Sequence, residues 1–149
     1  MIFLDTNVII RFLVAPGTDQ DRLWRAQSRV LMRGIASGTI RATMSEVVIH
    51  EVCYILGSKR HFQMHPSEII ARMRSILALY GMWFEGGEGA VFQRAFELWA
   101  EHPKLEFADS VIAARCERSG HELATFDRHF ADLPFIALWR PEAAPSLES

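Results

Sequence analysis

Short, largely apolar segments alternate with longer amphipathic segments along this chain, and this alternation limits its fold more than any other feature. The apolar segments predict strands near residues 2–4, 40–44, 82–84, 122–126 and 135–138. The amphipathic segments predict helices near residues 8–13, 19–34, 46–57, 66–80, 90–101 and 107–119. Strands separated by helices are typical of a parallel sheet that helices cover on both faces. We therefore predict an α/β fold, with a single domain over residues 1–140 and a flexible C-terminal tail over 141–149.

The composition is that of an ordinary globular protein. Of the 149 residues, 50% are hydrophobic and 23% are charged, which excludes a disordered chain. The formal net charge is -2, so the chain lacks the overall basic excess that many nucleic-acid-binding proteins show. No segment resembles a signal peptide or a membrane span, so we expect a cytoplasmic protein with no membrane partner. Cys53 and Cys116 lack the spacing of a zinc or redox motif and are predicted to be free thiols.

Two carboxylates directly follow predicted strands. Asp5 comes after the first apolar segment, and Asp127 comes after the segment that ends at Phe126. In a parallel α/β sheet, ligands bind beyond the carboxyl ends of the strands, so both side chains are expected at that edge. Aspartate is also a favoured turn and capping residue, and for Asp5 alone a capping role is an equal explanation.

Two further carboxylates lie within predicted helices. Glu51 shares a predicted helix face with Val47, Val48 and Ile55, so it interrupts an apolar stripe. A buried carboxylate is costly unless it is protonated, paired or bound to metal, and a buried ion pair with an arginine is the structural alternative. Asp109 lies in the first turn of its helix, where the helix dipole alone would favour an acid.

Convergence of these four acids at one sheet edge would require a cation. Two carboxylates about 4 Å apart repel each other by about 4 kcal/mol at an effective dielectric constant near 20. Carboxylate oxygens without thiolates favour Mg²⁺ or Mn²⁺ over zinc or copper. A divalent ion held in this way is suited to hydrolysis of a phosphodiester, because it activates water and stabilises the leaving oxygen.

Four sequence motifs, in order along the chain, carry a family resemblance. They are F-L-D-T-N-V-I-I from Phe3, S-E-V-V-I-H-E-V-C-Y-I-L from Ser45, F-A-D-S-V-I-A-A-R from Phe107 and L-A-T-F-D-R-H-F from Leu123. Together they resemble the PIN-domain nucleases, and most closely the VapC-type toxins of bacterial type II toxin–antitoxin systems. The resemblance implies a three-layer α/β/α, Rossmann-like fold with a five-stranded parallel sheet of order 3-2-1-4-5. It also implies a Mg²⁺- or Mn²⁺-dependent endoribonuclease.

The resemblance also implies roles and partners. Asp5 and Asp109 would be the principal direct metal ligands, and Glu51 and Asp127 would complete the acidic catalytic site. Residues that would orient ligands or water are Thr6, Asn7 and Thr125. The implied partners are an RNA substrate, a cognate antitoxin protein and a second copy of the chain in a homodimer. Arg11 and Arg128 flank the acidic motifs and could contact RNA phosphates, although each is also explained as a solvated surface charge.

Three other functions stay open at this point. A housekeeping RNA-processing nuclease would need the same four acids. A catalytically inactive binding module would keep the fold and use the pocket for a partner. A phosphatase with Asp5 as nucleophile would usually carry a second acid two residues later, and Asn7 occupies that position.

Overall fold

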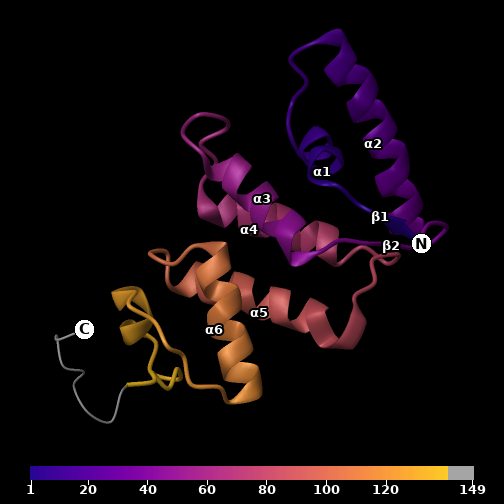
Figure 1. Cartoon of the computed structure of the whole chain (residues 1–149). Coiled ribbons are helices and arrows are strands. Elements are labelled where there is room, and N and C mark those ends of the chain that lie inside the picture. The colour runs from indigo at the N-terminus through magenta and orange to yellow at the C-terminus, as the bar shows by residue number, and fades with distance from the viewer. Residues whose placement is uncertain (141–149) are drawn as a thin grey trace, which may run out of the picture.

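The computed structural model describes residues 1–140, and the tail predicted over 141–149 lies outside the described residues. The N-terminal elements occupy one side of the molecule, whereas α6 and the segments that follow it occupy the other (Figure 1). Helices α3, α4 and α5 lie between these two parts. Within the described part, no helix is both long enough and apolar enough to cross a bilayer.

The α-helices begin and end close to their predicted limits. They are α1 (Thr6–Leu13), α2 (Asp19–Ser37), α3 (Glu46–Gly57), α4 (Pro66–Leu77), α5 (Glu88–Glu101) and α6 (Phe107–Ser119). Two short 3₁₀ segments, η1 (Glu85–Gly87) and η2 (Arg128–Asp132), complete the helical elements. The predicted start of α5 at Ala90 is two residues late, because the glycine-rich segment before it forms η1 and leads directly into the helix.

Capping interactions explain why these limits were predictable. Thr18 accepts a hydrogen bond from the backbone N–H of Asp21, and Asp21 accepts one from Thr18, which is a complete capping box at the start of α2. Gly38 ends α2 in the left-handed conformation with φ of 79°. At the start of α3, the Ser45 side chain accepts from the backbone N–H of Val48.

The sheet is much shorter than predicted. Strands β1 (Ile2–Phe3) and β2 (Ala42–Thr43) pair in parallel, with Ile2 opposite Ala42. Ala42 also forms a parallel bridge with Met82, so β2 lies between β1 and the segment at 82. A second parallel bridge joins Leu123 to Leu138. The predicted strands at 82–84, 122–126 and 135–138 are therefore reduced to single bridges.

The five-strand order remains a prediction. Met82, in the third predicted strand, pairs with β2, and β2 pairs with β1, which agrees with the 3-2-1 part of that order. The Leu123–Leu138 bridge joins the fourth and fifth predicted strands and agrees with the 4-5 part. Within residues 1–140, however, β1 pairs with β2 alone and not with the segment around Leu123. The α/β class holds for the described residues, although helices dominate them.

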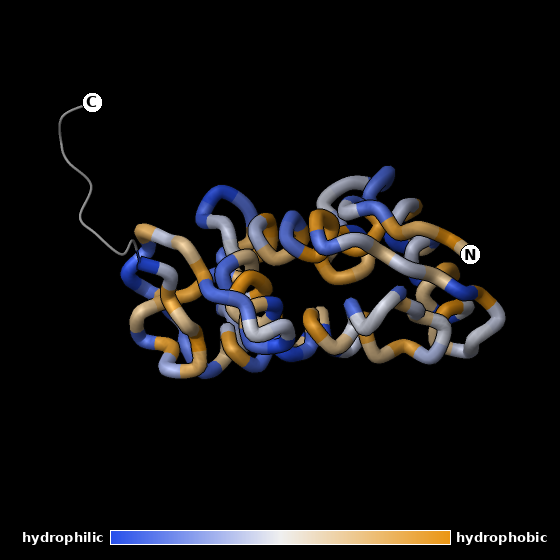
Figure 2. The backbone as a smooth tube through the Cα atoms, turned by 60° about the horizontal axis from the view of Figure 1, so that its bottom comes forward, coloured by the Kyte–Doolittle hydropathy of each residue, from blue (hydrophilic) through white to orange (hydrophobic). Residues whose placement is uncertain are grey.

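A single apolar core holds the helices together. Apolar and polar segments alternate along the backbone, as expected for helices that bury one face (Figure 2). The interface of α5 with α6 contains the largest buried rings, with the Phe96 and Phe107 centroids 4.9 Å apart and Trp99 6.4 Å from Phe107. The fully buried Leu4 anchors the chain in this core immediately before Asp5.

Candidate functional site

Asp5 lies at the junction between β1 and α1, as predicted. Its side chain accepts a hydrogen bond of 2.8 Å from the backbone N–H of Thr6 and is the N-cap of α1. The residue is nevertheless exposed, so its carboxylate also faces solvent. Capping and ligand binding are compatible here, because a carboxylate has about four lone-pair positions and the cap uses one of them.

Thr6 connects this junction to α3. Its hydroxyl donates a 2.6 Å hydrogen bond to Oε2 of Glu51, 45 residues away in the sequence. Thr6 is buried, with 8% of its surface exposed, so the position of its hydroxyl is fixed by packing. Asp5, Thr6 and Glu51 are therefore brought together at one place in the fold.

The predicted burial of Glu51 is wrong. Glu51 is exposed, and Val47, which shares its face, is 64% exposed. The buried face of α3 is formed instead by Val48, Ile49, Val52, Cys53 and Leu56. Glu51 thus pays no large desolvation cost, and among the described residues its side-chain partner is the Thr6 hydroxyl rather than a buried arginine.

Asp109 lies in the first turn of α6, as predicted. Its Oδ2 accepts a 3.2 Å hydrogen bond from the backbone N–H of Glu106, which caps the helix. The residue is partly buried, between the fully buried Ser110 and the exposed Glu106. Helix capping accounts for this contact, and the second carboxylate oxygen takes no part in it.

Asp127 forms a compact turn with its neighbours. Its backbone N–H donates to the Thr125 hydroxyl at 3.0 Å, and its Oδ1 accepts from the His129 N–H at 2.8 Å. The His129 ring also approaches the same carboxylate, with Nδ1 3.2 Å from Oδ1. Phe126, directly before this turn, is fully exposed at 107% of its reference surface. Thr125 thus fixes the backbone at Asp127.

The four acids are not all gathered in one place. Within residues 1–140, no three His, Cys, Asp or Glu side chains lie close enough together to hold a metal ion. Asp5 and Glu51 are linked through Thr6, whereas Asp109 and Asp127 lie on α6 and on the segment that follows it. The chemistry of the donor set still suits Mg²⁺ or Mn²⁺, because every predicted ligand offers carboxylate oxygen.

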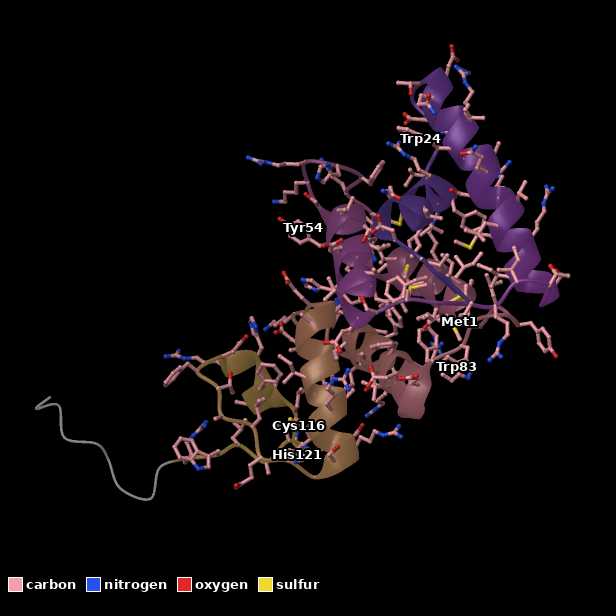
Figure 3. All side chains as sticks on the ribbon, turned by 45° about the vertical axis from the view of Figure 1, so that its right-hand side comes forward. Met1, Trp24, Tyr54, Trp83, Cys116 and His121 are labelled. Carbon is pink, nitrogen blue, oxygen red and sulfur yellow. The ribbon has the colours of Figure 1, made fainter. Side chains whose placement is uncertain are left out.

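The buried Cys53 is a poor candidate for a metal ligand. Burial raises the pKa of the Cys53 thiol to about 12, so it stays protonated at neutral pH. Cys116 lies near His121 at the end of α6, far from Met1 (Figure 3), and its backbone carbonyl accepts from the His121 N–H at 3.2 Å. Both are free, as predicted.

Asn7 and Arg11 line a hollow of about 600 Å³ between α1 and α2. Arg11 forms a 2.7 Å ion pair with Asp21 and stacks over the Trp24 ring at 5.1 Å. Its charge is therefore already partnered within the protein. Arg128 begins η2 and is exposed. An RNA contact by either arginine remains a prediction.

An ion cluster around Arg115 was not predicted. Arg115 forms salt bridges with Glu46 at the start of α3 and with Glu88 at the start of α5, the latter at 2.9 Å. Hydrogen bonds from Arg115 hold the pKa of the Glu88 carboxyl below its ordinary value, and both glutamates hold the pKa of Arg115 above its own. Sequence reasoning missed the cluster because Arg115 lies 69 residues from Glu46 and 27 from Glu88.

Comparison with known proteins now gives the family. A search of curated protein sequences returns no significant match. The family model described as "PIN domain" matches residues 2–136, which include all four predicted acids. PIN domains are generally nucleases and typically depend on metal ions. The chain belongs to the PIN domain family.

Proposed function

We propose that this chain is a Mg²⁺- or Mn²⁺-dependent endoribonuclease that acts as a VapC-type toxin of a toxin–antitoxin pair. The observation that carries the proposal is the Thr6–Glu51 hydrogen bond, which places a helix carboxylate beside the strand-end acid Asp5 in a PIN-family chain. The toxin role rests on the four motifs and their spacing.

In this proposal, Asp5 and Asp109 are direct metal ligands, and Glu51 and Asp127 complete the acidic site. A bound divalent ion would supply an activated water and stabilise the leaving oxygen of the phosphodiester. The chain itself positions the oxygens: the backbone N–H of Thr6 orients Asp5, and the Thr6 hydroxyl orients Glu51. Thr125 holds the turn that presents Asp127, and Asn7 follows Thr6 on α1.

Completion of this site requires the sheet order 3-2-1-4-5, in which residues 122–126 pair with the edge of β1 opposite β2. Exposed apolar side chains on both segments favour that pairing, since Phe3 is 62% exposed and Phe126 is fully exposed. Burial of a phenylalanine is worth about 2 kcal/mol. Pairing would place Asp127 and Asp5 at the ends of adjacent parallel strands.

The partners are also proposals. Single-stranded or structured RNA would be the substrate, and an antitoxin would cover the active site. The hollow between α1 and α2 is partly apolar and includes Trp24, which is 44% exposed and projects from α2 (Figure 3). A surface of this kind could receive an antitoxin segment or the second subunit of a homodimer.

The nuclease proposal is tested with purified protein, RNA and Mn²⁺. Cleavage is expected, EDTA should abolish it, and Asp5→Asn should reduce it by about tenfold or more, since even loss of an outer-shell partner commonly costs ten- to a hundredfold. Asparagine is as good an N-cap as aspartate, so this substitution removes the charge while α1 still begins normally. Glu101→Gln removes one charge in the same way and is the control, because Glu101 is exposed at the end of α5 and lies outside the site.

Cleavage that survives both EDTA and Asp5→Asn would contradict the proposal. A protein that binds Mn²⁺ without cleaving RNA would favour the inactive binding module. For the toxin role, expression of the wild-type chain should arrest bacterial growth, and expression of Asp5→Asn should not. RNA cleavage without growth arrest would favour the housekeeping nuclease.

A further inference from the structure

Four arginines form a stripe along α2. Arg22, Arg25, Arg29 and Arg33 are spaced three or four residues apart, which places them on one face of the helix. At a rise of 1.5 Å per residue, the stripe extends over about 16 Å. After Asp21 no acidic residue occurs in α2, so this face is uniformly basic although the whole chain has a net charge of -2.

The arginines of this stripe have few acidic partners. Arg22 pairs with Asp19 at 2.9 Å, but both side chains are largely exposed, at 66% and 97%, and such surface pairs are weak. Arg25, Arg29 and Arg33 form no salt bridge with any residue of the described part. The Nε of Arg25 is buried without a hydrogen-bond partner, again among residues 1–140.

The four side chains line a common hollow. Its volume is about 440 Å³, and its remaining walls come from Pro16, Ala26 and Val30. Nitrogen-tipped side chains project from α2 into the surrounding space (Figure 3). The wall contains no aromatic residue and no carboxylate. The apolar part of this wall consists of Pro16, Ala26 and Val30 and offers no aromatic anchor for an amphipathic helix, in contrast to the hollow lined by Trp24 on the other flank of α2.

We propose that the stripe of Arg22, Arg25, Arg29 and Arg33 binds the phosphate backbone of single-stranded RNA and thereby holds the substrate for the proposed nuclease. The inference rests on the proposed function for the identity of the nucleic acid and for its role as the substrate. Guanidinium groups bind phosphate oxygens in bidentate geometry, and every cation of the stripe is arginine rather than lysine. Their regular spacing suits a polymer with a charge at each repeat better than a compact ligand.

Counterion release makes this proposal measurable. For single-stranded nucleic acid, the logarithm of the binding constant falls with the logarithm of salt concentration, with a slope of about −0.7 for each phosphate neutralised. Binding of a short fluorescein-labelled single-stranded RNA is followed by anisotropy in EDTA, so that hydrolysis cannot interfere. Arg25→Ala/Arg29→Ala/Arg33→Ala should make the slope shallower by about 2 and weaken binding about tenfold at moderate salt.

A control variant that loses the same number of positive charges distinguishes an effect of the stripe from an effect of the protein's net charge. Arg74→Ala/Lys104→Ala/Arg140→Ala removes three exposed cations from other parts of the described surface and should leave the slope unchanged. Replacement of the three stripe arginines by lysine should restore most of the salt dependence. Should the triple alanine variant fold poorly, Arg29→Ala/Arg33→Ala changes only exposed positions and should make the slope shallower by about 1.4.

The outcomes distinguish this inference from the proposed function. Equal slopes for the stripe and control variants, or no RNA binding by the wild-type protein, would overturn it. Binding of labelled polyglutamate is measured in parallel. If the stripe variant loses polyglutamate binding but binds RNA as the wild type does, the stripe binds an acidic polypeptide and not RNA. If RNA binding depends on the stripe but the protein does not cleave RNA in Mn²⁺, the nuclease proposal is contradicted and the stripe proposal is supported. If the protein cleaves RNA but binding does not depend on the stripe, the nuclease proposal is supported and the stripe proposal is contradicted.

Discussion

The Thr6 hydroxyl donates a 2.6 Å hydrogen bond to Oε2 of Glu51, and this bond couples the start of α1 to the middle of α3. Thr6→Val keeps the shape of the side chain and removes the donor. A hydrogen bond to a charged group contributes about 1.5–3 kcal/mol to stability. Because Glu51 is exposed, this bond should lie in the lower part of that range, so we expect the free energy of unfolding to fall by up to about 2 kcal/mol. Denaturant titration measures this change.

The same variant tests the site, because Glu51 would lose its fixed position. RNA cleavage by Thr6→Val should fall about tenfold or more under conditions where the protein is fully folded. Thr6→Ser keeps the hydroxyl and should retain most of the activity. Equal activity of the valine and serine variants would show that Thr6 does not position Glu51 for catalysis.

The amide of Phe3 reports directly on the sheet order. The amides of Ile2 and Leu4 donate to Arg41 and Thr43, so alternation directs the Phe3 N–H toward the opposite edge of β1. If residues 122–126 pair with that edge, hydrogen exchange at Phe3 should be slowed as strongly as at Leu4. Amide exchange by NMR measures both. Rapid exchange at Phe3 with a protected Leu4 would argue against the 3-2-1-4-5 order.

Gly81 occupies a position with no space for a side chain. A Cβ there would lie 2.2 Å from the Ile40 carbonyl oxygen and 2.7 Å from that of Ile35. Gly81→Ala should therefore lower the free energy of unfolding by about 1–3 kcal/mol, as overpacking does elsewhere. Gly17→Ala is the control, because its nearest contact would be an ordinary 3.6 Å. Calorimetry that gave equal melting temperatures for the two variants would contradict the packing seen here.

The Arg115 cluster predicts a pH dependence of stability. The pKa of Glu88 is lowered in the folded state, so its contribution is present above its unfolded value of 4.5 and is lost as the pH falls through the folded value. Arg115→Met should destabilise the protein by about 1 kcal/mol at neutral pH, given the partly exposed side chains. The difference from wild type should shrink below pH 4.5, whereas Arg74→Met should show no such trend. Urea titrations over this pH range provide the measurement.

The helices were predictable because local chemistry sets their ends. Ser45 and Pro66 begin helices and Gly120 ends one, each through an interaction within a few residues. The strands were less predictable, because their length depends on pairing partners far away in the sequence. The segment 122–126 has the apolar pattern of a strand, yet in the described residues only Leu123 pairs, and its partner is Leu138.

In the candidate site too, the features set by local sequence were predictable and those set by distant contacts were not. The positions of Asp5 and Asp109 at helix starts follow from local sequence, and the structure confirms them. Asp127 was expected directly after a strand, but that strand is reduced to a bridge at Leu123, and Asp127 instead begins η2 as its N-cap. The burial of Glu51 could not be judged from periodicity, because Val47 is apolar and nevertheless 64% exposed. The Thr6–Glu51 bond spans 45 residues and required the fold itself.

The shortness of β1 has a consequence for aggregation. An unpaired sheet edge can template the growth of cross-β fibrils when it presents a long row of free N–H and C=O groups. β1 has only two residues, and the edge that β2 leaves uncovered in the described part of the chain ends where α1 begins at Thr6. Until residues 122–126 pair with it, such an edge offers too few backbone groups to recruit a second chain into a growing fibril, even with Phe3 exposed.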